Sequence, residues 1–374
     1  MTDERPLLFE RFPSLEGHVE WLELGECPTP VDRLSGISEA RGLSGLYIKR
    51  DDLSSPHYGG NKVRKLEFVL ARAKALGHKS VLTLGAAGSN HVLATVIHGE
   101  RLGIRTIAVL SPQPNAAYVR KNLLLDMAHG ARIVYTDNMA GLPVALGRGA
   151  SIGLKEDGRV PFMIPPGGTG ARGCLGYVDG ALELKRQVGE GLLPEPEFIF
   201  VTLGSAGTAG GLILGVEAAG LKSLVVPVRV VDRYVCNEYV LAFHVNNARR
   251  FLRSRGADLP SRPTLPREIP LVNNFAGERY AKFTAECMEA VGMARRLDGI
   301  KLDGTYTGKT MAGALDFIEK HGLQKRRLLF WNTYSSVDLY PRVEDSDYRD
   351  LPRALHRYFE QPLQEEEMGC EVVY

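Results

Sequence analysis

From residue 46 onward, short hydrophobic runs of strand length alternate with longer stretches of helical periodicity. The run SVLTLG at 80–85 is followed by the helical pattern NHVLATVIHGERLG at 90–103 and then by TIAVLS at 106–111. The rhythm returns with FIFVTLG at 198–204, a helix of small residues, and SLVVPVRVV at 223–231. Strands that alternate with helices are typical of parallel sheets covered by helices. The pattern therefore predicts an α/β fold with two such units.

Several of the predicted strands run directly into glycine clusters. These clusters are GAAG at 85–88, GG at 167–168 and GSAG at 204–207. In open α/β sheets, ligands bind beyond the carboxyl ends of the strands. We therefore expect the functional site to lie where these clusters meet.

Two other segments show no such pattern. Residues 245–268 are rich in arginine and proline and are predicted to form a surface helix and connection. After about residue 340 the chain becomes polar around the amphipathic stretch LPRALHRYF at 351–359. This end of the chain is either a packed arm or a partly disordered tail.

Composition narrows the class of partner. The 374 residues include 46 basic and 44 acidic side chains, so the net charge of +2 gives no field that attracts nucleic acid or a membrane. The five cysteines lack the spacing of a zinc site and fit reduced thiols in a cytoplasmic protein. Neither a secretory signal nor an apolar run of about 18 residues is present. A small-molecule partner is therefore expected.

The segment GGNKVRKLE at 59–67 places a lysine, Lys62, after two glycines and an asparagine and at the start of a helical pattern. Glycines allow close approach to a ligand. Partial burial and the nearby charges of Arg64 and Lys65 lower the pKa of an amine toward the neutral nucleophile. Taken alone, the segment fits equally a loop that leads into a basic helix.

Two strand-to-helix turns add polar groups to the expected site. GSAGTAGG at 204–211 offers backbone N–H groups and hydroxyls to a phosphate, but it lacks the GK[ST] ending of a nucleotide-binding loop. GSNH at 88–91 presents Ser89 and Asn90 at a helix start, where they either cap the helix or bind a ligand. His91, next to them, is a weaker candidate for an acid or base.

Together these motifs resemble the fold-type II pyridoxal-phosphate (PLP) enzymes of the D-cysteine desulfhydrase and 1-aminocyclopropane-1-carboxylate (ACC) deaminase family. The resemblance spans roughly residues 20–340. It is carried by YIKRDDLSSPHYGGNKVRKLEF at 47–68, GSNH, IPPGGTGARGCLGYVDGALELKRQ at 164–187, LGSAGTAGG at 203–211, and LDGTYTGKTMAGALDFI at 302–318.

The resemblance implies a role for each matching residue. Lys62 would form the Schiff base with PLP and move the substrate proton, Lys65 and the turn at 205–208 would hold the phosphate, and Asn90 would face the phenolic oxygen. Ser89 would bind the substrate carboxylate or assist proton transfer. The implied catalytic residues are Lys62, Ser89, Tyr280 and Tyr306, and the implied cofactor contacts are Lys62, Lys65, Asn90, Gly204, Ser205, Ala206, Gly207, Thr208, Thr307 and Thr333.

Departures from the family pattern bear on the reaction. Thr307 stands where ACC deaminases have a glutamate near the pyridine nitrogen, and a neutral residue there favours loss of a β-substituent over ring opening. The family's phosphate turn lacks its histidine here and reads GTAG at 207–210. The glutamine before Ser-Asn is Gly88, and the late glycine pair is replaced within NTYSS at 332–336. These changes indicate a substrate that differs from the substrates of the family members that keep the pattern.

The resemblance implies a tryptophan synthase β-like architecture of two open twisted sheet domains with the cofactor between them. The expected large domain comprises 1–64 and 171–340, the small inserted domain 65–170, and a C-terminal extension 341–374.

The expected protein is a cytoplasmic homodimer that converts a small amino acid to a 2-oxo acid and ammonia by α,β-elimination. The alternatives are ACC-type ring opening, β-replacement, and a PLP-binding relative that no longer turns over substrate.

Overall fold

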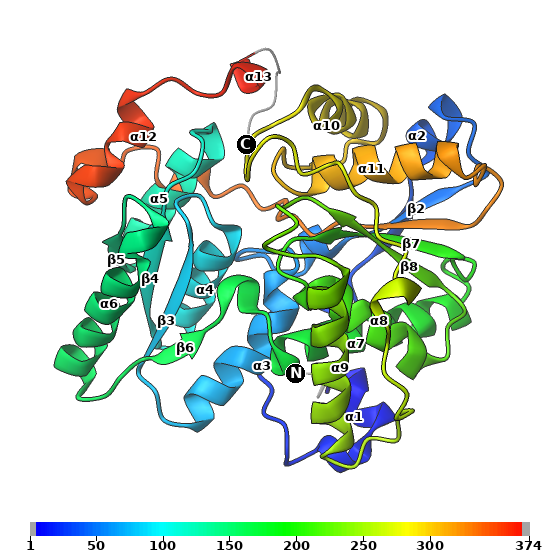
Figure 1. Ribbon diagram of the computed structural model, residues 1–374, viewed down its shortest axis with the longest axis horizontal. Helices are drawn as coiled ribbons and strands as arrows, with labels where there is room; N and C mark the ends of the chain where they lie inside the picture. The colour runs from blue at the N-terminus through cyan, green and yellow to red at the C-terminus, as the bar shows by residue number, and fades with distance from the viewer. Residues whose placement is uncertain (1–4, 369–374) are drawn as a thin grey trace.

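The computed structural model describes residues 5–368 as two lobes, each built around its own β-sheet (Figure 1). The strands are β1 (Val31–Arg33), β2 (Leu46–Lys49), β3 (Ser80–Ala86), β4 (Arg105–Ser111), β5 (Arg132–Tyr135), β6 (Phe162–Ile164), β7 (Phe198–Leu203), β8 (Leu224–Arg229) and β9 (Leu328–Trp331). The α/β fold with two sheets that the sequence predicts is confirmed.

Helices cover both sheets. They are α1 (Leu7–Arg11), α2 (Ser35–Ala40), α3 (Lys62–Ala75), α4 (Asn90–Arg101), α5 (Ala117–Ala128), α6 (Leu142–Asp157), α7 (Ala171–Gly189), α8 (Gly207–Ala219), α9 (Glu238–Arg253), α10 (Ala285–Asp298), α11 (Thr307–Lys320), α12 (Arg357–Glu360) and α13 (Glu365–Met368). Among residues 5–368, no helix combines the length and apolar character needed to cross a membrane.

The smaller lobe is formed by one continuous stretch of chain. Its four strands lie in the order β5-β4-β3-β6 and are all parallel. This order brings the carboxyl ends of β3 and β4 to one edge of the sheet, so the glycine cluster after β3 faces the other lobe.

The larger lobe joins segments that are far apart in the sequence. Its strands lie in the order β1-β2-β9-β7-β8, with β1 antiparallel to β2 and the other neighbours parallel. Strand β9 is fully buried between β2 and β7, and Leu328 pairs with both Leu46 and Phe198. The middle of this sheet therefore needs strands from the N-terminal, central and C-terminal parts of the chain.

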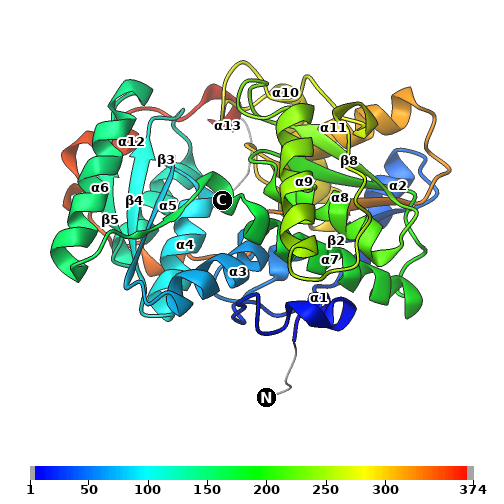
Figure 2. The ribbon, with the colours of Figure 1, turned by 60° about the horizontal axis from the view of Figure 1, so that its bottom comes forward.

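Helix α3 lies at the base between the two lobes (Figure 2). It packs on α7 of the larger lobe and on α4 of the smaller one. The α3–α7 contact is backbone to backbone, because a Cβ at Gly176 would lie 2.1 Å from the carbonyl oxygen of Arg64. Helix α3 runs without a break across residues 64 and 65, and the expected domain boundary at that point stays a prediction.

A buried ionic network fixes the start of α3. Arg64 is 1% exposed and donates to Asp51 at 3.0 Å and to Glu183 at 2.9 Å. Glu183 also pairs with Lys49, and Asp51 accepts a hydrogen bond from the indole of Trp331 at 2.7 Å. Because buried charges are tolerated only when they are paired, the network links β2, α3, α7 and β9 in one arrangement.

The C-terminal extension, as far as residue 368, is a packed arm that lies over both lobes (Figure 1). Arg120 of α5 donates to the carbonyl of Tyr358 at 2.7 Å. On the other lobe, Gln364 accepts from the backbone N–H of Phe283 at 3.0 Å, and Glu366 pairs with Lys282 at 2.7 Å. Of the two readings of the polar C-terminal sequence, the arm is therefore the observed one for these residues.

Candidate active site

A cavity of about 400 Å³ lies between the lobes at the carboxyl ends of β3 and β7, where the sequence predicts the functional site. Its walls come from the loop before α3, the start of α4, the turn before α8, and segments near residues 280, 305 and 333. The predicted residues that line it are Lys62, Lys65, Ser89, Asn90, Gly204, Ser205, Ala206, Thr208, Tyr280, Tyr306 and Thr333.

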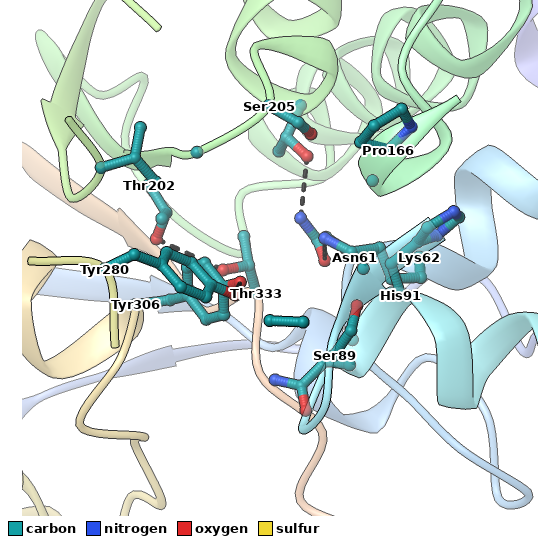
Figure 3. A pocket seen from close by; sticks show the side chains of 18 of the residues that line it. Asn61, Lys62, Ser89, His91, Pro166, Thr202, Ser205, Tyr280, Tyr306 and Thr333 are labelled. Carbon is teal, nitrogen blue, oxygen red and sulfur yellow. Dashed lines mark hydrogen bonds between the residues drawn. The ribbon is translucent and has the colours of Figure 1, made fainter. Parts of the chain in front are cut away.

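Lys62 is the first residue of α3 and is half-buried at the cavity wall (Figure 3). Its Nζ donates to Oδ1 of Asn61 at 2.8 Å, and Asn61 in turn donates to Thr208 at 2.8 Å. Burial, followed by the charge of Lys65, lowers the pKa of Lys62 well below its ordinary value. The lowered pKa favours the neutral amine, which is the form that reacts with an aldehyde.

The glycine pair before Asn61 is required by the close approach of other backbone segments. Gly60 has φ +88°, and a Cβ there would lie 2.8 Å from the carbonyl oxygen of Tyr334. A Cβ at Gly59 would lie 2.4 Å from the carbonyl oxygen of Asp52. Both positions exclude a side chain, so the pair holds Lys62 against the cavity.

The turn before α8 forms a cradle for an anion. Ser205 and Ala206 lie directly before the first residue of α8, Gly207, where backbone N–H groups are free of helical partners. A Cβ at Gly207 would lie 3.0 Å from Nζ of Lys65 and 2.9 Å from Oγ1 of Thr169. Thr169 donates to Ser205 at 2.7 Å, so hydroxyls, an amine and a helix start converge on one small space.

The donor set of this cradle fits a phosphate monoester. Lys65 is 1% exposed, its Nζ donates to the carbonyl of Gly167 at 3.1 Å, and burial lowers its pKa to about 8. At pH 7 the ammonium form predominates, and it would be stabilised further by a phosphate dianion. The sequence placed Gly167 among the strand-end glycines but gave Thr169 no role.

The start of α4 provides a second set of N–H groups at the cavity. Ser89 caps this helix by accepting from the N–H of Val92 at 3.3 Å. The helix N-terminus attracts a carboxylate as well as a phosphate. The structure therefore shows Ser89 as a cap that also lines the cavity, and its contact with a ligand stays a prediction.

Tyr280 and Tyr306 form a pair on one wall of the cavity (Figure 3). Their hydroxyls share a short hydrogen bond, and their rings meet edge to face with centroids 6.2 Å apart. Burial raises the pKa of Tyr280, and burial together with Tyr280 raises the pKa of Tyr306 well above its ordinary value. Both phenols therefore keep their protons, and the hydroxyl that accepts the shared hydrogen bond can donate its own proton to a substrate group.

Two of the predicted residues, Gly207 and Thr307, are not among the described residues that line the cavity. Gly207 lies directly behind the cradle, in contact with Lys65. Thr307 is fully buried, and its hydroxyl donates to Asp303 at 2.6 Å. The geometry therefore does not support Thr307 as the residue that faces a pyridine nitrogen.

Hydroxyl groups of two other threonines do reach the cavity. Thr202 and Thr333 both line it, with their Oγ1 atoms 3.4 Å apart, and Thr202 is also 2.8 Å from Oγ1 of Thr310 (Figure 3). Thr333, which the sequence placed among the cofactor contacts, is thus available on this wall.

Sequence reasoning missed Asp303 and Tyr58, which also line the cavity. Asp303 accepts from the N–H groups of Thr305, Tyr306 and Thr307 and so pairs the N–H groups that lead into α11. An aspartate just before a helical pattern is a capping signal that could have drawn attention to it.

His91 also lines the cavity. Its Nε2 lies 3.0 Å from the hydroxyl of Thr83. Burial, followed by the charge of Lys62, lowers the pKa of His91 well below its ordinary value. The imidazole is therefore neutral near pH 7, and a proton-donor role is not favoured.

The fold and this combination of a buried lysine of lowered pKa and an anion cradle define a class of enzyme. A family model described as pyridoxal-phosphate dependent enzyme matches residues 22–333, which is most of the chain. A curated D-cysteine desulfhydrase from Yersinia enterocolitica is 33% identical over 304 residues, covering 80% of this chain and 88% of the relative. The chain belongs to the PLP-dependent enzymes of fold type II, in the D-cysteine desulfhydrase and ACC deaminase family.

Solved structures agree with this assignment. The crystal structure of an ACC deaminase homologue has a TM-score of 0.73 at 30% identity, covering 91% of this chain and 98% of the homologue. A threonine deaminase isoform from Solanum lycopersicum has a TM-score of 0.58 at 16% identity, covering 92% of this chain and 93% of that one, and it shows the fold alone. The expected family, fold type and cofactor are confirmed.

Proposed function

We propose that this PLP-dependent enzyme catalyses α,β-elimination on a small amino acid. In the net reaction, the amino acid and one water give a 2-oxo acid, ammonia and the protonated leaving group. The observation that carries the proposal is the placement of Lys62, an amine whose pKa burial lowers, and of the hydrogen-bonded pair Tyr280 and Tyr306 around one cavity. This arrangement supplies a base for the α-hydrogen and a proton donor for the β-substituent.

PLP, when bound, supplies an electron sink that makes the α-hydrogen of an attached amino acid acidic. The turn at Ser205 and Lys65 would hold its phosphate, and Asn90 would donate to its phenolic oxygen. Ser89 and the start of α4 would bind the substrate carboxylate. Lys62, once released from the cofactor aldehyde, would accept the α-proton.

Elimination is favoured over ring opening by the neutral groups on one cavity wall. We assign the contact with the pyridine nitrogen to Thr333 rather than to Thr307, because Thr333 lines the cavity and Thr307 does not. A hydroxyl at this place does not protonate the ring as a carboxylate would, and the weaker electron sink favours prompt loss of a leaving group.

The substrate side chain is proposed to be small and uncharged. No arginine lines the cavity in the described part of the chain, and its two lysines, Lys62 and Lys65, are assigned to the cofactor. A second carboxylate on the substrate would therefore lack a cationic partner.

ACC ring opening is the second candidate, favoured by the similarity to the ACC deaminase homologue at 30% identity. We also propose, from the family resemblance, a homodimer in the cytoplasm. The four described cysteines are free thiols, which suits a reducing compartment; Cys370 lies outside the described residues.

The direct test is a product assay with the purified holoenzyme. Its substrates are D- and L-cysteine, β-chloro-D- and β-chloro-L-alanine and ACC, and its readouts are 2-oxo acid, ammonia and sulfide. We expect 2-oxo acid and ammonia in equal amounts from one of the β-substituted amino acids, with Lys62→Ala inactive. Turnover of ACC alone would favour the second candidate, and turnover of none with cofactor bound would contradict both.

A further inference from the structure

Asn90 occupies the cavity wall with only one end of its amide available to a ligand. Its Oδ1 accepts hydrogen bonds from the hydroxyl of Tyr58 at 3.2 Å and from Nδ2 of Asn122 at 3.1 Å. No described residue is shown as a partner of its Nδ2. The side chain therefore presents a donor, and not an acceptor, to whatever the cavity binds.

The orientation of this amide follows from an unambiguous acceptor. The backbone carbonyl of Gly88 accepts from Asn122 at 2.9 Å, so the Asn122 atom that faces it must be nitrogen. The same nitrogen faces Asn90, so the Asn90 atom opposite must be oxygen. Both hydrogens of the Asn122 amide are then used, and neither amide can turn over without losing a hydrogen bond.

Tyr58 is held in a state and place suited to donation. It is 7% exposed, and burial raises the pKa of its phenol well above the ordinary value, so the hydroxyl keeps its proton. Its backbone carbonyl accepts from Nε2 of His98 at 3.0 Å. Burial lowers the pKa of His98 to about 4, so its ring is neutral with the proton on Nε2.

Asn122 is similarly fixed. It is 2% exposed and lies within α5, a helix of the smaller lobe, whereas Tyr58 belongs to the loop before α3. The two donors thus reach the same oxygen of Asn90 from different elements. An amide held from two sides loses little side-chain entropy when a ligand accepts its hydrogen bond.

We propose that Tyr58 and Asn122 are positioning residues that hold the amide nitrogen of Asn90 toward the cavity as a hydrogen-bond donor to the phenolic oxygen of PLP. The proposal rests on the placement of that oxygen against Asn90 made above. Neither residue needs to touch the cofactor, since each acts through the oxygen of Asn90.

The test is a double-mutant cycle on PLP affinity and on the pH titration of the bound cofactor's absorbance. Tyr58→Phe removes one donor at almost constant volume. We expect it to weaken PLP binding about threefold to tenfold, in line with the loss of one hydrogen bond. We also expect it to raise the pKa of the bound chromophore, because a donor to the phenolic oxygen stabilises the deprotonated form. In the Asn90→Ala background, Tyr58→Phe should change neither quantity.

The control is Tyr47→Phe on β2, outside the cavity, which should leave both readouts unchanged. Asn122→Leu provides a second variant. In the Asn90→Ala background it too should change neither PLP affinity nor the pKa of the bound chromophore. Equal effects of Tyr58→Phe with and without Asn90 would mean a merely structural role and would overturn the proposal. If Tyr58→Phe alone changes neither PLP affinity nor the pKa of the bound chromophore, the proposal is also overturned. If Asn90→Ala itself changes neither readout, the placement of the phenolic oxygen is wrong, while the proposed reaction is still tested by its products.

Discussion

The hydroxyl of Thr307, the first residue of α11, donates across 2.6 Å to Oδ1 of Asp303, which precedes the helix and lines the cavity. Asp303 in return accepts from the N–H of Thr307 at 2.8 Å. This pair holds the start of the helix that follows Tyr306, so we expect Thr307 to contribute to the shape of the site rather than to contact with the cofactor.

Thr307→Val should therefore affect stability more than cofactor binding. We expect the free energy of unfolding to fall by about 1–2 kcal/mol, because a buried hydroxyl donor is lost. The dissociation constant of PLP should stay within about twofold. Chemical denaturation and equilibrium dialysis of the same preparation measure the two effects, and loss of PLP without loss of stability would restore Thr307 to the cofactor site.

Lys65 should make phosphate binding depend on pH. Because burial holds the pKa of its amine at about 8, the free protein loses this positive charge as the pH rises past 8. Pyridoxine 5'-phosphate, which has no aldehyde to react with Lys62, isolates the phosphate contact. Its second phosphate pKa is about 6, so the ligand stays a dianion from pH 7 upward.

We expect the affinity for this ligand to fall about tenfold between pH 7 and pH 9.5 in the parent. Lys65→Gln should bind more weakly at pH 7 and show a nearly flat profile. Titration calorimetry at several pH values separates the two proteins, and a flat profile in the parent would contradict the role of Lys65.

Ser205→Asp should weaken PLP binding strongly, by roughly thirtyfold or more, since it places a carboxylate against the phosphate at the start of α8. Ser35, the exposed first residue of α2, provides the matched control because Ser35→Asp adds the same charge at a helix start away from the cavity. Similar affinities in the two variants would show that the cradle is elsewhere.

Glu67 should make the protein less stable at pH 7 and above than at pH 5. This buried carboxyl accepts from the N–H groups of Leu24 and Gly25 at 3.2 and 3.3 Å, and burial raises its pKa from 4.5 to about 7. The folded state thus keeps a proton that the unfolded chain has released, and the resulting stability is lost as the pH rises through 7.

Glu67→Gln keeps the acceptor oxygen and carries no titratable proton. Relative to the parent, it should gain on the order of 2 kcal/mol in free energy of unfolding between pH 5 and pH 8.5. Urea unfolding at both pH values gives the difference. A pH-independent difference would mean that the carboxyl titrates at an ordinary pKa.

The part of the cavity wall around Lys62 and Ser205 was predictable because its chemistry is local in the chain. Lys62 follows its glycines directly, and Ser205 stands between a strand and a helix start, so neighbouring residues alone define each environment. Thr307 was assigned to the cofactor by its position in a motif. The direction in which a side chain points at a helix start, however, depends on which N–H groups there still need a hydrogen-bond partner. Asp303 supplied that partner from four residues upstream.

The lobes were predictable from periodicity, but long-range contacts were not. The C-terminal arm is polar, and its attachment uses backbone groups such as the carbonyl of Tyr358 and the N–H of Phe283, which composition does not reveal. Tyr58 was missed for a related reason. Its hydroxyl meets Asn90 only after α3 and α4 have packed together.

The position of β9 has a consequence for synthesis on the ribosome. Strand β2, which leads toward Lys62, and strand β7, which leads toward the phosphate cradle, are not neighbours and each pairs with Leu328 and the residues after it. A nascent chain that ends before residue 328 therefore holds both segments but lacks the strand that aligns them. The smaller lobe, whose four strands lie between residues 80 and 164, can acquire its sheet while the chain is still being made. Cofactor capture must then wait until translation has passed Trp331, so pulse-labelled chains should acquire tight PLP binding only near full length.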